Sequence, residues 1–228
     1  MDPGIRFMIF MQGCGLKCKY CHNRDTWDTN TGGKWYSVTE VLNEAKKYKT
    51  YFDLSGGGIT VSGGDPLFQL DFVNELFKQA KQNGIHTCLD TSGYINIDKI
   101  KPLLENTDLI LLDIKHMDDK IHQWLTGVSN EKILNLARYL SDINFPIWIR
   151  HVLVPGISDD IRHLNMLGNF LNELNNVEDF ELLAYHTMGK YKWYELGLTY
   201  ELERVRNANQ DDIDRAMNII NSIRNRHL

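Results

Sequence analysis

The chain has 228 residues, of which 43% are hydrophobic and 24% charged, and its formal net charge is −5. This composition predicts one globular domain, residues 1–228, and excludes a disordered protein because apolar and aromatic residues recur throughout. The longest aliphatic run, 109–112, is far shorter than the roughly 20 residues of a membrane span, and the N-terminus lacks a secretory-signal pattern. The negative net charge argues against nucleic-acid binding.

Short apolar runs rich in β-branched residues alternate with longer segments of helical period. The expected strands are 5–10, 59–61, 86–89, 109–112, 147–154 and 180–184, and the expected helices are 38–48, 70–83, 97–104, 133–143, 161–174 and 213–223. Six strand-then-helix units predict an α/β fold with a parallel sheet. A doubly wound open sheet and a barrel both fit. A complete barrel typically takes about 250 residues, so six units favour a partial (β/α)6 barrel.

Polar residues recur where the expected strands end. The segments are the cysteine cluster after the first strand, then 62–66, 90–93, 113–115, Arg150 with 155–156, and 185–186. In parallel α/β folds the chemistry gathers at the carboxyl ends of the strands. We therefore expect one active site on this face.

Three of the four cysteines, Cys14, Cys18 and Cys21, fall within eight residues, whereas Cys88 lies in the middle of an expected strand. Clustered cysteines in an intracellular protein favour a metal or redox site over a disulfide framework. Three thiolates can hold three irons of a cubane iron–sulfur cluster and leave the fourth iron open. Cys88 is expected to be a small buried side chain.

Two other interpretations of the cluster stay open. A structural zinc site could add His22, although adjacent Cys21 and His22 close a tetrahedron awkwardly and no second cysteine pair follows. A redox Cys-x-x-Cys pair could use Cys18 and Cys21, although that motif usually follows a strand directly.

The spacing Cys14-x3-Cys18-x2-Cys21 after the first strand is similar to that of the radical S-adenosylmethionine (SAM) superfamily. The segments 13–27, 56–64, 84–91, 127–130 and 148–150 resemble the pyruvate formate-lyase activating enzymes, and the similarity runs from Gly4 to the last helix. The resemblance implies a partial (β/α)6 barrel and an oxidoreductase, a [formate-C-acetyltransferase]-activating enzyme. Such an enzyme cleaves SAM at a reduced [4Fe-4S] cluster to methionine and a 5′-deoxyadenosyl radical, which takes a hydrogen from a glycine of pyruvate formate-lyase.

The resemblance also implies roles for single residues. Cys14, Cys18 and Cys21 would hold the cluster, and Lys115 would act in catalysis. The positions implied for SAM binding are Tyr20, Asn23, Gly63, Gly64, Asp65, Lys115, Arg150, Val152 and His186. The positions implied for a monovalent cation are Asp90, Thr91, the Leu111 carbonyl and Asp113.

Several of these positions have simpler interpretations. Asp65 stands where the family has a glutamate one methylene longer, so a direct carboxylate contact with SAM would need a water, whereas Gly63 and Gly64 would keep theirs. The turn 62–66 could be an ordinary strand-to-helix turn. Asp113 and Lys115 could form a simple ion pair, and His186 a satisfied histidine at the barrel mouth.

The implied partners are pyruvate formate-lyase and flavodoxin or a similar reductant, in an anoxic cytoplasm and in anaerobic glucose metabolism. The aromatic segments 25–36 and 189–194 could be packed surface or could lie near the protein partner. A small-molecule radical SAM enzyme and a metal-stabilised binding module are the alternative functions. The family usually begins Asp-Gly-Pro-Gly-Ile-Arg after a lead-in segment, so we expect either a start upstream of Met1 or an uncovered first strand.

Overall fold

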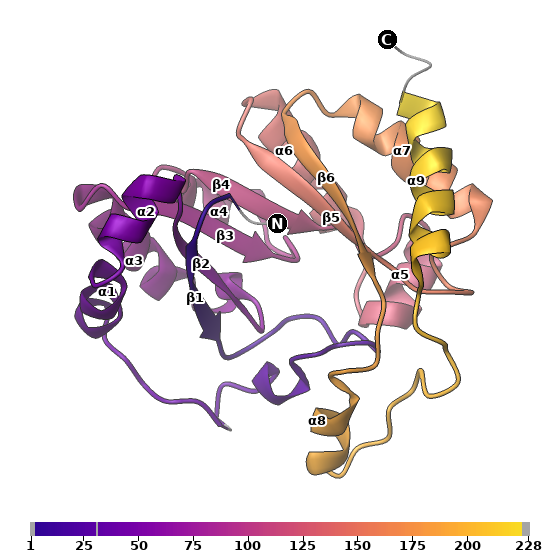
Figure 1. Ribbon diagram of the computed structural model, residues 1–228, viewed down its shortest axis with the longest axis horizontal. Coiled ribbons are helices and arrows are strands. Elements are labelled where there is room, and N and C mark those ends of the chain that lie inside the picture. The colour runs from indigo at the N-terminus through magenta and orange to yellow at the C-terminus, as the bar shows by residue number, and fades with distance from the viewer. Residues whose placement is uncertain (1–2, 31, 225–228) are drawn as a thin grey trace.

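The computed structural model describes residues 3–30 and 32–224. Met1 and Asp2, where the start of the chain was compared with that of the family, lie outside the described residues. Six parallel strands form one sheet in the order in which they occur along the chain (Figure 1). The strands are β1 (Arg6–Met11), β2 (Gly58–Gly63), β3 (His86–Thr91), β4 (Leu109–Asp113), β5 (Ile147–Leu153) and β6 (Val177–Ala184). The six expected strands are confirmed.

The strand order separates the two architectures that the sequence left open. A doubly wound sheet reverses its strand order part-way, whereas a barrel adds each strand beside the previous one. Here the order is sequential, and within the described residues β1 and β6 remain the two edges of the sheet. The fold is therefore a partial (β/α)6 barrel, as expected.

The strands divide their side chains between the core and the inner face. In β5 the buried positions Ile147, Ile149 and Leu153 alternate with the half-buried Trp148 and Arg150. This alternation follows from the two-residue period of a strand. One set packs under the helices, and the other, which includes Arg150, points toward the concave side where a ligand can bind.

Most of the helices pack around the outside of the curved sheet, whereas α8 lies beyond the carboxyl ends of the strands (Figure 1). Those that correspond to expected helices are α1 (Val38–Lys46), α3 (Leu70–Gln82), α4 (Ile97–Leu104), α6 (Glu131–Asp142), α7 (Ile161–Glu173) and α9 (Gln210–Arg224). The capping box predicted at Ser37 and Glu40 is present, with the Glu40 backbone N–H donating to Ser37 Oγ at 3.2 Å.

The sequence did not predict three helices and two short 3-10 helices. They are α2 (Lys49–Ser55), α5 (Asp119–Thr126), α8 (Lys190–Glu195), η1 (Arg24–Thr26) and η2 (Pro66–Gln69). The helix expected over 38–48 ends at Lys46, and α2 follows it. In α5 the exposed Trp124 and Ile121 obscure the helical period, although Asp118 caps its N-terminus and Gly127 ends it with φ 81°.

The first strand is covered on one side only. Among the strands that the structure describes, β1 pairs only with β2, and its side chains Met8 and Phe10 are 38% and 59% exposed. Within the described residues no helix is both long and apolar enough to cross a membrane.

Candidate active site

A cavity of about 510 Å³ lies at the carboxyl ends of the strands. Segments that follow the strands supply its lining, including all three clustered cysteines. A larger hollow of about 840 Å³ lies beside the outer edge of β1, next to 32–36 and α1, and its lining contains no cysteine. We place the active site in the smaller cavity because the titratable side chains converge there.

Backbone hydrogen bonds hold the cysteine loop in place. The N–H groups of Lys17 and Lys19 donate to carbonyls in the last turn of α5, at 2.7 and 2.9 Å. At the start of the loop Gly13 lies against Gly64, where an added Cβ would come within 2.3 Å of the Gly13 carbonyl. The loop therefore cannot approach the β2 turn this closely unless residue 64 is a glycine.

Burial sets the protonation of the thiols. Burial raises the pKa of Cys14 to about 11, and it also raises the pKa values of Cys18 and Cys21. Iron binding must therefore displace protons from all three side chains. In the described part of the chain, no three His, Cys, Asp or Glu side chains converge to bind a single ion. A cubane cluster does not require such convergence, because each thiolate binds a different iron.

His22, the fourth ligand that a zinc site would need, lines the same cavity as the cysteines and contacts His186. Its Nε2 lies 2.8 Å from the carbonyl oxygen of His186, and the two imidazole centroids are 4.2 Å apart. The carbonyl holds the proton on Nε2, so only Nδ1 of His22 could bind a metal. Because no three His, Cys, Asp or Glu side chains of the described residues converge on a single point, the donors fit a three-cysteine cluster better than a Cys₃His zinc site.

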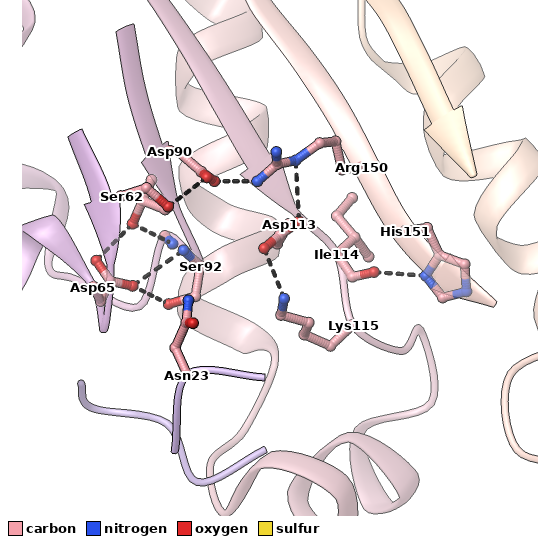
Figure 2. Close-up of polar contacts among 12 residues, drawn as sticks. Asn23, Ser62, Asp65, Asp90, Ser92, Asp113, Ile114, Lys115, Arg150 and His151 are labelled. Atoms are coloured by element: carbon pink, nitrogen blue, oxygen red, sulfur yellow. Dashed lines mark hydrogen bonds and ion pairs between the residues drawn. The ribbon is translucent and has the colours of Figure 1, made fainter. Parts of the chain in front are cut away.

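A chain of alternating charges crosses the cavity floor (Figure 2). Ser62 Oγ donates to Asp90 at 2.7 Å, and Asp90 pairs with Arg150. Arg150 Nε also lies 3.4 Å from Asp113, whose other oxygen is 2.7 Å from Lys115 Nζ. The expected ion pair between Asp113 and Lys115 is thus present, and it forms part of a network that spans four strands.

The network holds its members charged near neutral pH. Burial raises the pKa of Asp90 to about 6, although Arg150 acts in the opposite direction. Burial would also raise the pKa of Asp113, but Lys115 and Arg150 outweigh it and lower that pKa. Burial would lower the pKa of Lys115, but Asp113 raises it well above its usual value. Two carboxylates and two cations therefore face the cavity, and their charges nearly cancel.

Asp65 is placed differently from the other predicted SAM residues. It is 5% exposed, and its carboxylate accepts hydrogen bonds from Leu67 N (3.0 Å), Thr91 Oγ1 (2.8 Å), Ser92 N (3.1 Å) and Ser92 Oγ. Gly63 and Gly64 line the cavity, whereas Asp65 is absent from the lining. Its side chain ties the turn after β2 to the end of β3 (Figure 2).

Four other predicted SAM residues, Tyr20, Asn23, Val152 and His186, line the cavity. The buried Tyr20 hydroxyl and His186 Nδ1 have no hydrogen-bond partner within the described residues. Asn23 Nδ2 lies 3.5 Å from the Gly63 carbonyl. Leaving a buried polar atom without a partner costs free energy, so the Tyr20 hydroxyl and His186 Nδ1 are suited to hydrogen-bond a ligand in the cavity.

The predicted cation site is only partly assembled. Asp90, Thr91 and Asp113 line the cavity. Leu111 is fully buried within β4, packs with Cys88, and is not part of the lining.

The prediction that Cys88 is a small buried side chain is confirmed.

Three buried histidines that the sequence did not single out, His116, His151 and His163, contact one another next to the segment after β4, and hydrogen bonds fix the tautomers of two. Met117 N donates to His163 Nδ1 at 3.3 Å, so His163 Nε2 carries the proton and donates to His151 Nε2 at 3.2 Å. His151 Nδ1 then donates to the carbonyl of Ile114 at 2.6 Å, next to Lys115 (Figure 2). Burial lowers the pKa of His151 to about 4, so the ring is neutral near pH 7. The third histidine, His116, stacks on His163 with centroids 4.0 Å apart.

The sequence analysis also missed two tryptophans as parts of the site. Trp27 Nε1 donates to Cys21 Sγ at 3.3 Å, and Trp193 Nε1 donates to the Cys21 carbonyl at 2.9 Å. Trp193 is 4% exposed although its segment is aromatic and basic, whereas Trp35 is 88% exposed. Spacing could not separate the buried from the exposed aromatic residues, because the segment of Trp27 and Trp35 is mostly irregular and α8, which carries Trp193, has only six residues.

The comparisons with known proteins agree with this geometry. The model of the radical SAM superfamily matches residues 8–167. A pyruvate formate-lyase-activating enzyme from Staphylococcus aureus (strain USA300) is 52% identical over 225 residues, which cover 96% of this chain and 90% of that protein. The chain belongs to the pyruvate formate-lyase-activating enzyme family of the radical SAM superfamily.

Solved structures support the radical SAM fold. A domain of a pyruvate-formate lyase-activating enzyme from Bacteroides vulgatus aligns with a TM-score of 0.62 at 27% identity, covering 73% of this chain and 94% of that domain. The SAM-bound structure of SuiB from Streptococcus suis aligns with a TM-score of 0.74 over 98% of this chain and 48% of its own length. SuiB is 16% identical and therefore supports the fold alone.

Proposed function

We propose that this chain activates pyruvate formate-lyase by generating a glycyl radical on it. The observation that carries the proposal is the meeting, in one cavity, of three cysteine thiols and a balanced chain of two carboxylates and two cations. The 52% identity to an activating enzyme over nearly the whole chain supports the choice of substrate. The proposal treats residues 1–228 as one radical SAM domain.

Cys14, Cys18 and Cys21 would hold a [4Fe-4S] cluster. When bound, the reduced cluster supplies the electron that cleaves SAM to methionine and a 5′-deoxyadenosyl radical, which takes a hydrogen from glycine. The protein must place the three thiols, keep water away from them and orient SAM. Cys18 is buried and Cys14 and Cys21 are partly buried, and backbone hydrogen bonds hold their loop in place, which supports the first two tasks.

The cavity offers complementary groups for the parts of SAM. Lys115 and His186 would meet the carboxylate, and the backbone of Gly63 and Gly64 would meet the amino group. The unpartnered Nδ1 of His186 supports this assignment. Tyr20 and Asn23 would lie near the adenine, and Arg150 and Val152 near the methionine and adenosine parts. All eight of these residues line the cavity.

We also propose a monovalent cation at Asp90, Thr91, Asp113 and the Leu111 carbonyl. Hard oxygen donors suit such an ion. Arg150 already pairs with both carboxylates, so a cation there would share them with the guanidinium. Titration of SAM affinity against potassium, with a tetraalkylammonium salt keeping the ionic strength constant, tests the site. An affinity independent of potassium would contradict it.

The electron would come from flavodoxin or a similar reductant, in an anoxic cytoplasm, where the open iron of the cluster is protected from oxygen. The preparation should be brown under anaerobic conditions and bleach in air. Activity with pyruvate formate-lyase would also place the chain in anaerobic glucose metabolism.

The function is tested by incubating the reconstituted, reduced protein with SAM, with and without pyruvate formate-lyase. The expected result is activation of the lyase, together with 5′-deoxyadenosine formation that depends on its presence. Rapid, multiple turnover of a small molecule without any protein partner would instead support a small-molecule radical SAM enzyme. A colourless zinc protein that ignores SAM would support a binding module.

A further inference from the structure

Trp27 contacts both ends of the cysteine loop. It directly follows η1, and its carbonyl accepts the backbone N–H of Cys14 at 3.4 Å. Its indole Nε1–H donates to Cys21 Sγ at 3.3 Å. One residue thus closes the loop from the first cysteine to the third, and the contact with the third reaches the sulfur atom itself.

One aromatic ring and two cations surround the Trp27 ring. The Trp193 and Trp27 rings meet at 82°, with centroids 5.5 Å apart. The Arg24 guanidinium carbon lies 4.0 Å from the Trp27 ring centroid, and Lys17 Nζ lies 4.8 Å from it. Cations near an indole face are attracted to its π-electrons. They draw electron density from the ring and make its N–H a stronger donor.

A hydrogen bond to a ligand sulfur changes the energy of the group that the sulfur binds. Reduction adds one electron, supplied by the external reductant, and spreads negative charge onto the cysteine sulfurs. A donor aimed at the sulfur stabilises the more negative state, and hydrogen bonds to sulfurs are among the factors that set cluster potentials. The two nearby cations act in the same direction.

We propose that Trp27 is a positioning residue that raises the reduction potential of the cluster bound by the three cysteines, through its hydrogen bond to the Cys21 sulfur. The inference rests on the proposed function, because it requires the [4Fe-4S] cluster. It assigns to Trp27 a role in setting the cluster potential, which goes beyond holding the loop.

The test is the midpoint potential of the reconstituted cluster, measured by paramagnetic resonance during a redox titration without SAM. Two variants remove the donor: Trp27→Phe, and Trp27→3-benzothienylalanine, which replaces only the indole N–H with sulfur. Both should shift the potential to more negative values. Resonance Raman spectra should show higher iron–cysteine stretching frequencies, because a cysteine sulfur that accepts no hydrogen bond binds iron more strongly.

Trp193→Phe is the matched control. It also removes one buried indole N–H beside Cys21, but that donor reaches the carbonyl at 2.9 Å and leaves the sulfur contact in place. Its potential should stay close to that of the unmodified protein. If the control shifts as far as the Trp27 variants, packing rather than the sulfur contact sets the potential, and the inference is wrong.

The remaining outcomes are also decisive. Unchanged potentials and stretching frequencies in both Trp27 variants overturn the inference. If Trp27→Phe fails to hold a cluster, the benzothienyl variant decides, and failure of both variants overturns the inference in favour of a role in assembly. If the unmodified protein holds no reducible cluster, the proposed function itself fails, and that result is distinguishable because it does not depend on Trp27.

Discussion

Asp65 separates two accounts of the turn after β2. The resemblance implies a carboxylate that contacts SAM, whereas the structure uses that carboxylate to tie this turn to β3. Asp65→Asn keeps the shape of the side chain but replaces one acceptor oxygen with a donor. The Thr91 and Ser92 hydroxyls can rotate to accept, but the N–H groups of Leu67 and Ser92 cannot. In either orientation of the amide, one of these two backbone donors loses its partner.

The lost backbone hydrogen bond sets the size of the expected change in the free energy of unfolding. A buried N–H without a partner costs about 1–3 kcal/mol. Removing the buried charge of Asp65 relieves part of its desolvation, so we expect the free energy of unfolding to fall by about 2 kcal/mol. At about 2–4 °C per kcal/mol for a chain of this length, the Tm should fall by about 4–8 °C.

Thermal unfolding of the cluster-free protein, followed by circular dichroism, measures the effect, and SAM affinity is measured in parallel on the loaded protein. The exposed Asp71, in the first turn of α3, provides the control Asp71→Asn, which should change the free energy of unfolding by less than about 0.5 kcal/mol. If Asp65→Asn leaves the Tm within 1 °C of the parent but weakens SAM binding at least tenfold, Asp65 contacts SAM and the structural account is wrong.

Three further predictions concern the site. Lys115→Ala should weaken SAM binding about 10- to 100-fold, the loss of one charge-assisted hydrogen bond, and an unchanged dissociation constant in calorimetry would remove its proposed role. Cys18→Ala should lose the brown colour and SAM cleavage together, so retained cleavage would refute the cluster assignment. Because burial lowers the pKa of His151 to about 4, the unfolded chain binds a proton between about pH 6.5 and 4 that the folded protein does not. The free energy of unfolding should therefore decrease by roughly 3 kcal/mol in total as the pH is lowered from 6.5 to 4. Urea unfolding at several pH values should show a smaller decrease in His151→Gln, and equal pH slopes in the two proteins would contradict the prediction. Comparing the two proteins cancels the opposite contribution of Asp90.

The sequence predicted the sheet well because each strand carries its own signal. Short runs of β-branched and apolar residues marked all six strands, and sequential strand-then-helix units were enough to predict a parallel sheet. The strand order, which separates a partial barrel from a doubly wound sheet, depends on long-range pairing such as that of Arg6 with Gly58. No local pattern encodes such pairing.

The candidate site was predicted where its residues follow strands directly. The cysteine loop and the polar residues after β2, β3 and β4 fall into this group, because a parallel sheet brings such positions to one edge. The orientation of a side chain is a different matter. The Asp65 side chain points toward Thr91 and Ser92 rather than into the cavity. Its orientation depends on the tertiary contact between η2 and the end of β3.

Residues whose place in the site depends only on tertiary contacts were missed. Trp27 and Trp193 lie 166 positions apart in the sequence, and both donate to Cys21. Their aromatic segments suggested packed surface or a partner-facing loop, and only the tertiary contact between η1 and α8 shows that these two rings pack inward. The three buried histidines were missed for the same reason, since their hydrogen bonds join β5, α7 and the segment after β4.

The central claim is that this chain transfers a hydrogen atom from a glycine of pyruvate formate-lyase to the 5′-carbon of SAM. The most direct measurement uses pyruvate formate-lyase labelled with [2,2-²H]glycine, incubated anaerobically with the reduced protein and SAM. The account predicts that the doublet of the glycyl radical, which the remaining α-hydrogen produces, collapses to a singlet, and that the 5′-deoxyadenosine carries one deuterium. A singlet radical with unlabelled 5′-deoxyadenosine, or SAM cleavage with no radical on the lyase, would contradict it.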